Sequence, residues 1–253
     1  MSSVLPSLAL LAGGFATRMR PLTETVPKSM LKVAGYPFIA HQLRLLASRG
    51  IRDVVLCCGF LGEQIAEFVG DGSVFGCNVR YSHDGTRLRG TGGAIQKAFP
   101  MLGDHFFVMY GDSYLPAEIQ PVYDAFLKQS KLGMMTVFQN ENCWDTSNVE
   151  FSGQTILNYD KKNPTPAMHY IDYGLGILEK AGFERWKNEE VFDLSDVYRD
   201  LMRVGQLAGY EVNERFYEIG TPAGLTETEA LLSGSDSQPM LRGSGCKTLR
   251  RSE

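Results

Sequence analysis

The chain has 253 residues, enough for one large α/β domain or two small ones with a sizeable buried core. Its hydrophobic fraction of 43% and charged fraction of 21% are ordinary for a globular protein. The formal net charge of −4 gives no support for a nucleic-acid-binding protein, because such proteins usually carry a basic patch or a high pI.

The five cysteines are an odd number without regular spacing or a CxxC pair. This usage disfavours both a disulfide framework and a zinc site, so we expect a reduced, cytoplasmic setting. Residues 1–7 lack the positive region of a signal peptide. Since no apolar stretch approaches the ~20 residues of a membrane-spanning helix, we expect no membrane partner.

Apolar runs alternate with helical patterns over the first 112 residues. Strands are predicted at residues 5–12, 53–58, 79–82 and 105–110, and helices at residues 37–49, 62–69 and 93–102. Such an alternation predicts an α/β fold with a Rossmann-like, doubly wound and mostly parallel central sheet.

The second half of the chain is richer in strands. We predict strands at residues 133–139, 148–151, 155–159, 168–178, 207–213 and 216–219, and helices at residues 194–204 and 222–232. Ser152-Gly153 is a predicted hairpin turn. Residues 234–253 are rich in Gly, Ser, Lys and Arg, and we expect a flexible tail there.

A glycine pair, Gly13-Gly14, follows the first predicted strand. Ligands of open α/β sheets bind beyond the carboxyl ends of the strands, and glycines there let backbone N–H groups approach phosphate oxygens. The planar guanidinium of Arg18 can reach the same phosphates. The spacing matches neither GxGxxG nor the Walker pattern, which disfavours a dinucleotide-binding dehydrogenase. A plain tight turn would also explain the glycine pair.

Three charged residues stand where phosphate chemistry could use them. Lys28 follows a proline ten residues after Arg18, and Asp112 ends an apolar strand on the ligand side of the sheet. Glu218 lies in an otherwise apolar strand, where a charge is costly unless it is paired or binds a metal. Magnesium prefers such carboxylate oxygens. The alternatives are a solvated lysine, a turn aspartate and an edge-strand glutamate facing water.

Five segments in register resemble the signatures of sugar-phosphate nucleotidyltransferases. LAGGFATRM at residues 11–19 resembles L-A-G-G-x-G-T-R-[LM], and PKSM at 27–30 resembles P-K-x-M. GTGGA at 90–94, GD at 111–112 and EIGTP at 218–222 resemble G-T-G-G-A, G-D and D-x-G-T-P. The resemblance covers about residues 5–232. Two positions depart from it, because Ala16 replaces the usual glycine and Glu218 the usual aspartate.

The resemblance implies an enzyme in which a sugar 1-phosphate attacks the α-phosphorus of a nucleoside triphosphate, and pyrophosphate leaves. It implies Mg²⁺ as cofactor and a single domain over residues 1–233, with a nucleotide-binding half at 1–132 and a sugar-binding half at 133–233. A homodimer is the family-level expectation.

The resemblance also implies roles for individual residues. The catalytic set would be Arg18, Lys28 and Asp112, and the metal ligands would be Asp112 and Glu218. The nucleotide would bind Leu11, Ala12, Gly13, Gly14, Asp84, Thr91, Gly92 and Gly93. The sugar phosphate would bind Asn148, Glu150, Asp172 and either Lys161 or Lys162, since the family's E-K-P segment fits residues 159–164 in two registers.

Several subfamilies stay open. Residues 90–94 and the short length most resemble heptose 1-phosphate guanylyltransferases, whereas residues 56–60 and 110–112 resemble glucose 1-phosphate cytidylyltransferases. Thymidylyl and uridylyl transfer are further alternatives. A catalytically dead nucleotide-sugar sensor is a different class, and the retention of Arg18, Lys28, Asp112 and a carboxylate at position 218 argues against it.

Overall fold

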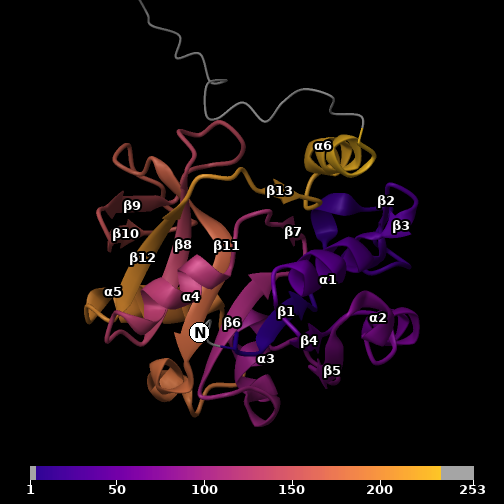
Figure 1. The fold of residues 1–253 in the computed structure, drawn as a ribbon, viewed down its shortest axis with the longest axis horizontal. Helices are drawn as coiled ribbons and strands as arrows, with labels where there is room; N and C mark the ends of the chain where they lie inside the picture. The colour runs from indigo at the N-terminus through magenta and orange to yellow at the C-terminus, as the bar shows by residue number, and fades with distance from the viewer. Residues whose placement is uncertain (1–3, 235–253) are drawn as a thin grey trace, which may run out of the picture.

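A nine-stranded sheet runs through the computed structural model, which describes residues 4–234 (Figure 1). Its strand order is β5-β4-β1-β6-β11-β8-β12-β10-β9. The strands are β1 (Leu8–Ala12), β4 (Asp53–Cys58), β5 (Asn78–His83), β6 (His105–Tyr110), β8 (Gly133–Gln139), β9 (Val149–Ser152), β10 (Thr155–Tyr159), β11 (Tyr170–Glu179) and β12 (Leu207–Val212). Apart from Gly234, the tail predicted at residues 234–253 lies outside the described residues.

The direction of the strands changes between the two halves of the sheet. β5, β4, β1 and β6 are parallel neighbours, whereas β11 runs antiparallel between β6 and β8. β12 is parallel to β8, and the β9–β10 hairpin closes the edge. Gly153 in the predicted hairpin turn has a φ of +64°. The predicted Rossmann-like α/β fold is confirmed, and its parallel pairs lie mainly in the first half.

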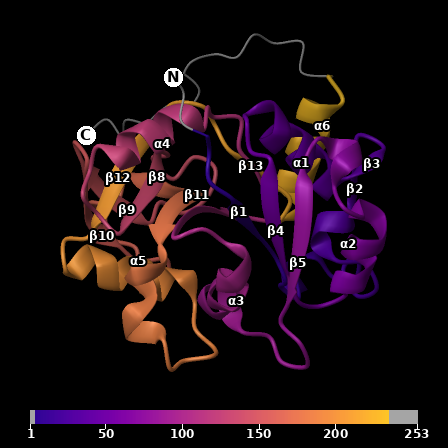
Figure 2. The same ribbon diagram turned by 60° about the horizontal axis from the view of Figure 1, so that its bottom comes forward.

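Helices cover both faces of the sheet (Figure 2). α1 (Phe38–Ser48), α2 (Gly62–Val69) and α4 (Gln120–Leu127) lie on one face, and α3 (Gly90–Ala98) and α5 (Leu194–Arg203) lie on the other. β1 shows why its sequence is apolar throughout. Leu8 and Leu10 pack into the core beneath α1, whereas Ala9 packs into the opposite core beneath α3. Strands buried on both faces need side chains that are apolar in both directions.

Several local elements differ from the sequence prediction. α3 begins at Gly90 rather than at residue 93, because its first turn packs directly on the loop before α5. α4 was not predicted, and a proline in its first turn starts it. The strand predicted at 216–219 is the two-residue β13 (Tyr217–Glu218), which pairs with β7 (Ser113–Tyr114) outside the central sheet.

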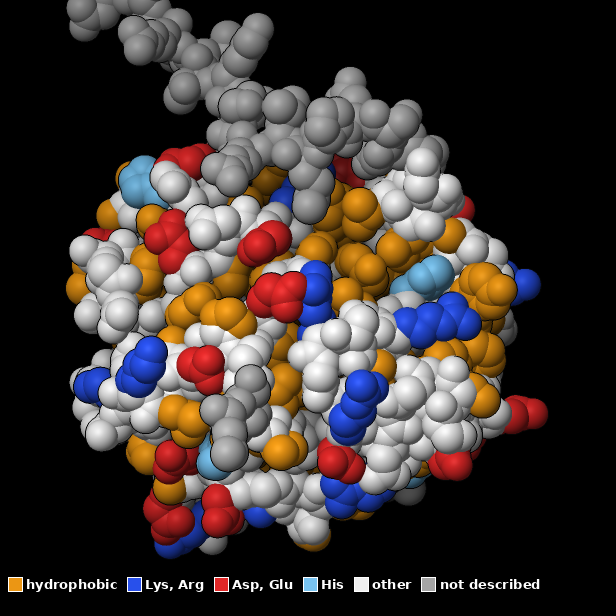
Figure 3. Space-filling view, in the orientation of Figure 1, with side chains coloured by type: hydrophobic (Ala, Val, Ile, Leu, Met, Phe, Trp, Pro, Cys, Tyr) orange, Lys and Arg blue, Asp and Glu red, His pale blue; other side chains and the backbone are white. Residues whose placement is uncertain are grey.

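The remaining elements are short, apart from α6 (Pro222–Leu232), which lies where a helix was predicted. β2 (Lys32–Val33) pairs with β3 (Tyr36–Pro37). Turns of 3-10 helix lie at Thr17–Met19, Lys28–Met30, Ser73–Phe75, Phe99–Met101 and Lys180–Trp186. Among the described residues, every helix is too short or too polar to cross a bilayer. Acidic and basic side chains are intermixed on the face shown in Figure 3.

Candidate active site

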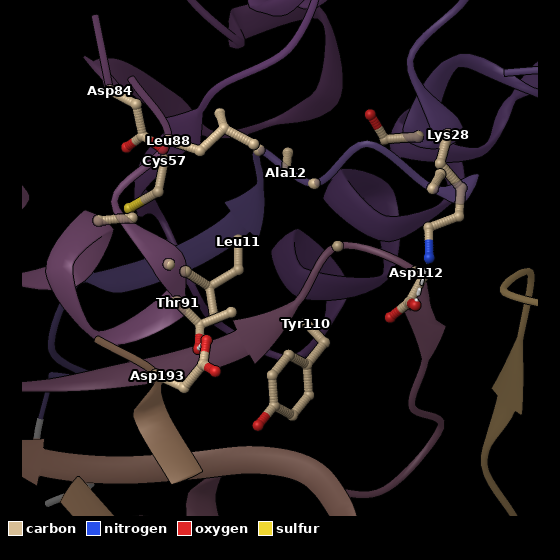
Figure 4. A pocket seen from close by; sticks show the side chains of 17 residues that line it. Leu11, Ala12, Lys28, Cys57, Asp84, Leu88, Thr91, Tyr110, Asp112 and Asp193 are labelled. Carbon is tan, nitrogen blue, oxygen red and sulfur yellow. Dashed lines mark hydrogen bonds and ion pairs between the residues drawn. The ribbon is translucent and has the colours of Figure 1, made fainter. Parts of the chain in front are cut away.

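A cavity of ≈ 330 Å³ opens at the carboxyl ends of β1, β4 and β6. This is where open α/β sheets bind ligands. Eight of the sequence-predicted residues line it, namely Leu11, Ala12, Gly13, Gly14, Lys28, Asp84, Thr91 and Asp112. Figure 4 shows that the cavity has two ends. Asp84, Leu88 and Cys57 gather at one end, and Lys28 and Asp112 face each other at the other.

The glycine loop after β1 is held by backbone contact with the loop after β4. A Cβ on Gly59 would lie 2.4 Å from the carbonyl oxygen of Gly13, and Phe60 N donates to that oxygen at 3.3 Å. Ala16, which replaces the usual glycine, has a left-handed backbone with φ 48° and ψ 44°. Thr23 Oγ1 donates to the Ala16 carbonyl at 2.9 Å. The departure at Ala16 therefore keeps a backbone conformation that glycine adopts more easily.

Lys28 and Asp112 form an ion pair with 2.6 Å between Nζ and Oδ2. Burial alone would raise the pKa of Asp112, but the adjacent Lys28 ammonium, a backbone hydrogen bond and the more distant Lys161 together outweigh burial and hold that pKa below its usual value. The fully buried Gln42 of α1 fixes the turn that carries Asp112, because its Nε2 donates to the carbonyls of Tyr110 (3.2 Å) and Ser113 (2.8 Å). The carboxylate is therefore ionised and rigidly placed.

Glu218 approaches Asp112 across Gly220. A Cβ on Gly220 would lie 2.5 Å from Glu218 Oε2, 3.4 Å from Asp112 Oδ2 and 3.6 Å from Arg18 Nη2. Glu218 also accepts hydrogen bonds from Gly220 N and, at 2.7 Å, from Thr221 Oγ1 at the start of α6. The absence of a side chain at Gly220 thus leaves a small space, here called the cradle, that is bordered by atoms of Asp112, Glu218 and Arg18.

This cradle fits a divalent cation. Two carboxylates are a usual protein contribution to a magnesium site, with phosphate oxygens and water completing the shell. Within residues 4–234, no group of three or more His, Cys, Asp or Glu side chains could share a metal ion. A cation held here would therefore have Asp112 and Glu218 as its carboxylate ligands.

At its opposite end the cavity is lined by Asp84 together with Leu88 and Cys57 (Figure 4). Asp84 is only 7% exposed, and its Oδ2 accepts a hydrogen bond from Arg89 N at 3.1 Å. Burial raises the pKa of Asp84, which the hydrogen bond and nearby cations partly oppose. Burial also raises the pKa of the Cys57 thiol far above its usual range, so that side chain stays protonated.

Two predicted nucleotide ligands have another role in the structure. Gly92 and Gly93 do not line the cavity, and their amides donate to the Phe192 carbonyl at 2.9 and 3.2 Å. A Cβ on Gly93 would lie 2.3 Å from the carbonyl oxygen of Glu190. These glycines let the start of α3 approach the loop before α5, and Thr91 beside them does reach the cavity.

The predicted sugar-phosphate residues only partly converge. Lys161 Nζ lies 2.9 Å from Asp172 Oδ2, and Asn148 Oδ1 accepts a hydrogen bond from Asp172 N at 3.0 Å. Lys162 is exposed, and its backbone amide donates a hydrogen bond to Asp160 Oδ1 at 2.7 Å. Glu150 lies on β9 opposite Asn158 of the hairpin. The structure thus joins Lys161, Asp172 and Asn148 and separates Lys162 from them.

Tyr110 and Asp193 are among the cavity-lining residues that were not predicted as site residues. Tyr110 forms a wall of the cavity, and its hydroxyl lies 3.2 Å from Lys161 Nζ, so this side chain connects the two groups of predicted residues. Asp193 caps α5 and accepts a hydrogen bond from Thr91 Oγ1 at 3.4 Å. The capping spacing of Asp193 and Asp196 was a readable helix-start signal, but no sequence signal placed that helix start beside Thr91.

The model of the family described as nucleotidyl transferase matches residues 9–232. The chain belongs to the nucleotidyl transferase family. This nucleotidyl transferase is 30% identical over 224 residues to the N-acetylmuramate alpha-1-phosphate uridylyltransferase of Neisseria meningitidis, covering 88% of this chain and 96% of that one. It is 24% identical to the D-glycero-alpha-D-manno-heptose 1-phosphate guanylyltransferase of Campylobacter jejuni, covering 84% and 94%.

Solved structures show the same fold. The inositol-1-phosphate CTP transferase from T. maritima superposes with a TM-score of 0.75 at 19% identity, covering 94% of this chain and 100% of that chain. The predicted family and enzyme class, a sugar-1-phosphate nucleotidyltransferase, are confirmed. The relatives differ among themselves in base and sugar, so the substrates of this chain must be argued from its own site.

Proposed function

We propose that this nucleotidyl transferase joins a nucleoside triphosphate bound in the cavity to a sugar 1-phosphate held at Lys161, with release of pyrophosphate. One observation carries the proposal. The Lys28–Asp112 pair lies at one end of the cavity, away from Asp84, and Tyr110 extends from the cavity wall to Lys161. A triphosphate with its base near Asp84 would bring its phosphates to the pair and close to a second anion at Lys161.

The proposed chemistry is an in-line displacement. A phosphate oxygen of the sugar 1-phosphate attacks the α-phosphorus, the bond to the pyrophosphate oxygen breaks, and pyrophosphate carries away the electron pair. Such transfers depend on positioning and charge stabilisation rather than on covalent help from the protein. The amides of Gly13 and Gly14 and the guanidinium of Arg18 would bind the triphosphate, and Lys28 would offset the charge between the two anions.

Asp112 and Glu218 are the residues that would hold Mg²⁺. When bound, the ion would supply charge neutralisation at phosphate oxygens. Arg18 Nη2 borders the same cradle at Gly220, so its guanidinium would also lie beside the phosphates of the triphosphate and offset their charge.

Two substrate pairs are supported by separate observations. Guanylyl transfer is favoured by Asp84, because guanine presents two adjacent N–H donors and a carboxylate accepts both, and a heptose 1-phosphate as acceptor is favoured by the Campylobacter relative. Uridylyl transfer to an N-acetylated sugar acid phosphate is favoured by the Neisseria relative, which this chain covers over 96% of its length. Rates with GTP and UTP distinguish them.

A substitution at Lys28 tests the catalytic role proposed for this residue. We expect Lys28→Ala to lower turnover by roughly two or more orders of magnitude, because one lost preorganised donor typically costs ~3 kcal/mol of transition-state stabilisation. Pyrophosphate release measures the rate, and circular dichroism checks the fold. Lys32→Ala, at an exposed position nearby, is the matched control. A folded Lys28→Ala enzyme with wild-type turnover would exclude the assignment.

A further inference from the structure

The most densely hydrogen-bonded carboxylate beside the cavity is Asp172, and it is 2% exposed at its side chain. We propose that Asp172 and Tyr110 are positioning residues that hold the Lys161 ammonium for the incoming sugar phosphate, and that Asp172 is not itself a sugar ligand. The inference rests on the proposed function, and it reassigns a residue that the family resemblance placed among the sugar contacts.

The oxygens of Asp172 are already occupied. Oδ2 accepts hydrogen bonds from Tyr159 OH (3.2 Å) and Tyr110 OH (3.4 Å) and pairs with Lys161 Nζ (2.9 Å). Oδ1 accepts a hydrogen bond from Gly174 N at 3.1 Å. A carboxylate offers about four acceptor sites, two on each oxygen, so Oδ2 is fully used and Oδ1 could accept one more donor. The side chain is 2% exposed, which leaves a sugar hydroxyl little access to that site.

Lys161, by contrast, has a donor to spare. An ammonium carries three N–H donors, of which one points to Asp172 and one to Tyr110 OH at 3.2 Å. Its Nζ also lies 4.6 Å from the centroid of the Tyr110 ring, which favours a cation over that face. The Lys161 side chain is 39% exposed, so the third donor can meet an anion that arrives from solvent.

Tyr110 connects this arrangement to the place where the two substrates would meet. Its ring is part of the nucleotide cavity, while its hydroxyl contacts Lys161 and Asp172 on the far side. A sugar phosphate bound by the free donor of Lys161 would therefore sit next to the wall against which the triphosphate lies. These contacts would hold the sugar phosphate beside the triphosphate with the side chains placed as they are in the structure.

The charge of Lys161 depends on Asp172. Burial alone would lower the pKa of Lys161, but the Asp172 carboxylate and the Tyr110 hydroxyl together outweigh burial and hold that pKa above its usual value. Besides Asp172, the titratable groups that act on this ammonium are Tyr110, Tyr159, Tyr198 and Asp112. With Asp172 made neutral, burial acts on Lys161 with much less opposition.

The first test is steady-state kinetics of Asp172→Asn and Tyr110→Phe with the best substrate pair of the wild type. We expect Asp172→Asn to raise KM for every accepted sugar 1-phosphate by about tenfold or more, since hydrogen bonds to charged groups are lost. KM for the nucleoside triphosphate should stay within about twofold of wild type. Tyr110→Phe, which keeps the ring, should produce the same selective effect at smaller size. Lys162→Ala is the matched control and should leave both constants unchanged.

Two results would overturn the inference. One is an unchanged KM for the sugar phosphate in both variants. The other is an altered preference among sugar 1-phosphates in Asp172→Asn, because a direct sugar ligand changes selectivity whereas a positioning residue shifts all sugars alike.

A second measurement does not require turnover. The pKa of Lys161 can be followed by NMR on lysine-labelled protein, with Lys161→Met to assign the signal, and it should fall in Asp172→Asn. An unchanged pKa contradicts the inference even if the enzyme is active. Wild-type protein that releases no pyrophosphate with any substrate pair, yet shows the pKa shift, contradicts the proposed function instead.

Discussion

Lys28 and Asp112 show how one contact sets the charge of the site. Partial burial of Asp112 disfavours its ionised form, and the Lys28 ammonium at 2.6 Å is the main contributor among the groups that together favour it. Charged pairs at this separation are sensitive to the loss of either partner, because the remaining charge is left without compensation. The pair should therefore govern acid stability as well as catalysis.

The lowered pKa of Asp112 predicts a pH dependence of stability. A carboxyl whose pKa is lower in the folded than in the unfolded chain stabilises the fold above its ordinary pKa of about 4. That contribution disappears as the pH falls through the lower folded-state pKa. We expect the free energy of unfolding in urea to fall less steeply below about pH 4 in Asp112→Asn than in wild type. Asp104→Asn, at an exposed position, should keep the wild-type slope, and equal slopes in all three proteins would contradict the prediction.

The left-handed backbone of Ala16 predicts an effect of substitution on stability. Its left-handed backbone (φ 48°) costs an L-residue roughly 1–2 kcal/mol that glycine does not incur. Glycine also gains unfolded-chain entropy, which offsets part of the relief. We expect Ala16→Gly to raise the melting temperature slightly and to keep turnover. A clear loss of stability by calorimetry would show that the loop does not hold Ala16 in this conformation.

At the scale of elements, the contact between the β1 and β4 loops is close enough to depend on glycine. A Cβ on Gly59 would press on the Gly13 carbonyl at 2.4 Å, and backbone atoms cannot move aside cheaply. We expect Gly59→Ala to lower the free energy of unfolding by about 1–3 kcal/mol, the usual cost of overpacking. Gly14→Ala is the control for stability, since a Cβ there meets nothing within 4 Å. Equal denaturation midpoints for the two variants would count against the loop contact.

The elements also show what sequence could and could not predict. The apolar runs of β1, β4 and β6 were predictable because both faces of these strands are buried. The early start of α3 was not, since it depends on the loop before α5, some hundred residues away. α4 was missed because its buried stripe, made of Val122, Tyr123 and Phe126, lies within only eight residues, too few to show a clear helical period.

The candidate site also contains residues that were predictable from sequence and residues that were not. Motifs in register contain seven of the eight predicted cavity residues, all but Asp84, because backbone loops and charges at strand ends leave a sequence signature. The choice between Lys161 and Lys162 could not be read, since both fit the motif and only contact with Asp172 separates them. Tyr110 was noted only as part of the segment at residues 110–112, because its link to the other half of the sheet depends on Lys161, in the loop after β10, and on Asp172, on β11.

At the scale of the whole molecule, one sheet connects the proposed nucleotide-binding and sugar-binding halves. They meet at the antiparallel pair β6–β11, where Leu175 lies opposite Met109. Tyr110 follows at the end of β6, and Asp172 lies three residues before Leu175 on β11. The proposed junction of the two substrates is therefore built on paired strands rather than on a hinge between separate units.

Pyrophosphate release by the wild-type chain with Mg²⁺, four nucleoside triphosphates and a panel of sugar 1-phosphates tests the central claim most directly. The account predicts release that requires both substrates, is lost without divalent cation, and is fastest with GTP and a heptose 1-phosphate or with UTP and N-acetylmuramate 1-phosphate. No release with any pair, together with tight binding of a nucleotide sugar, would contradict the account and favour a sensor.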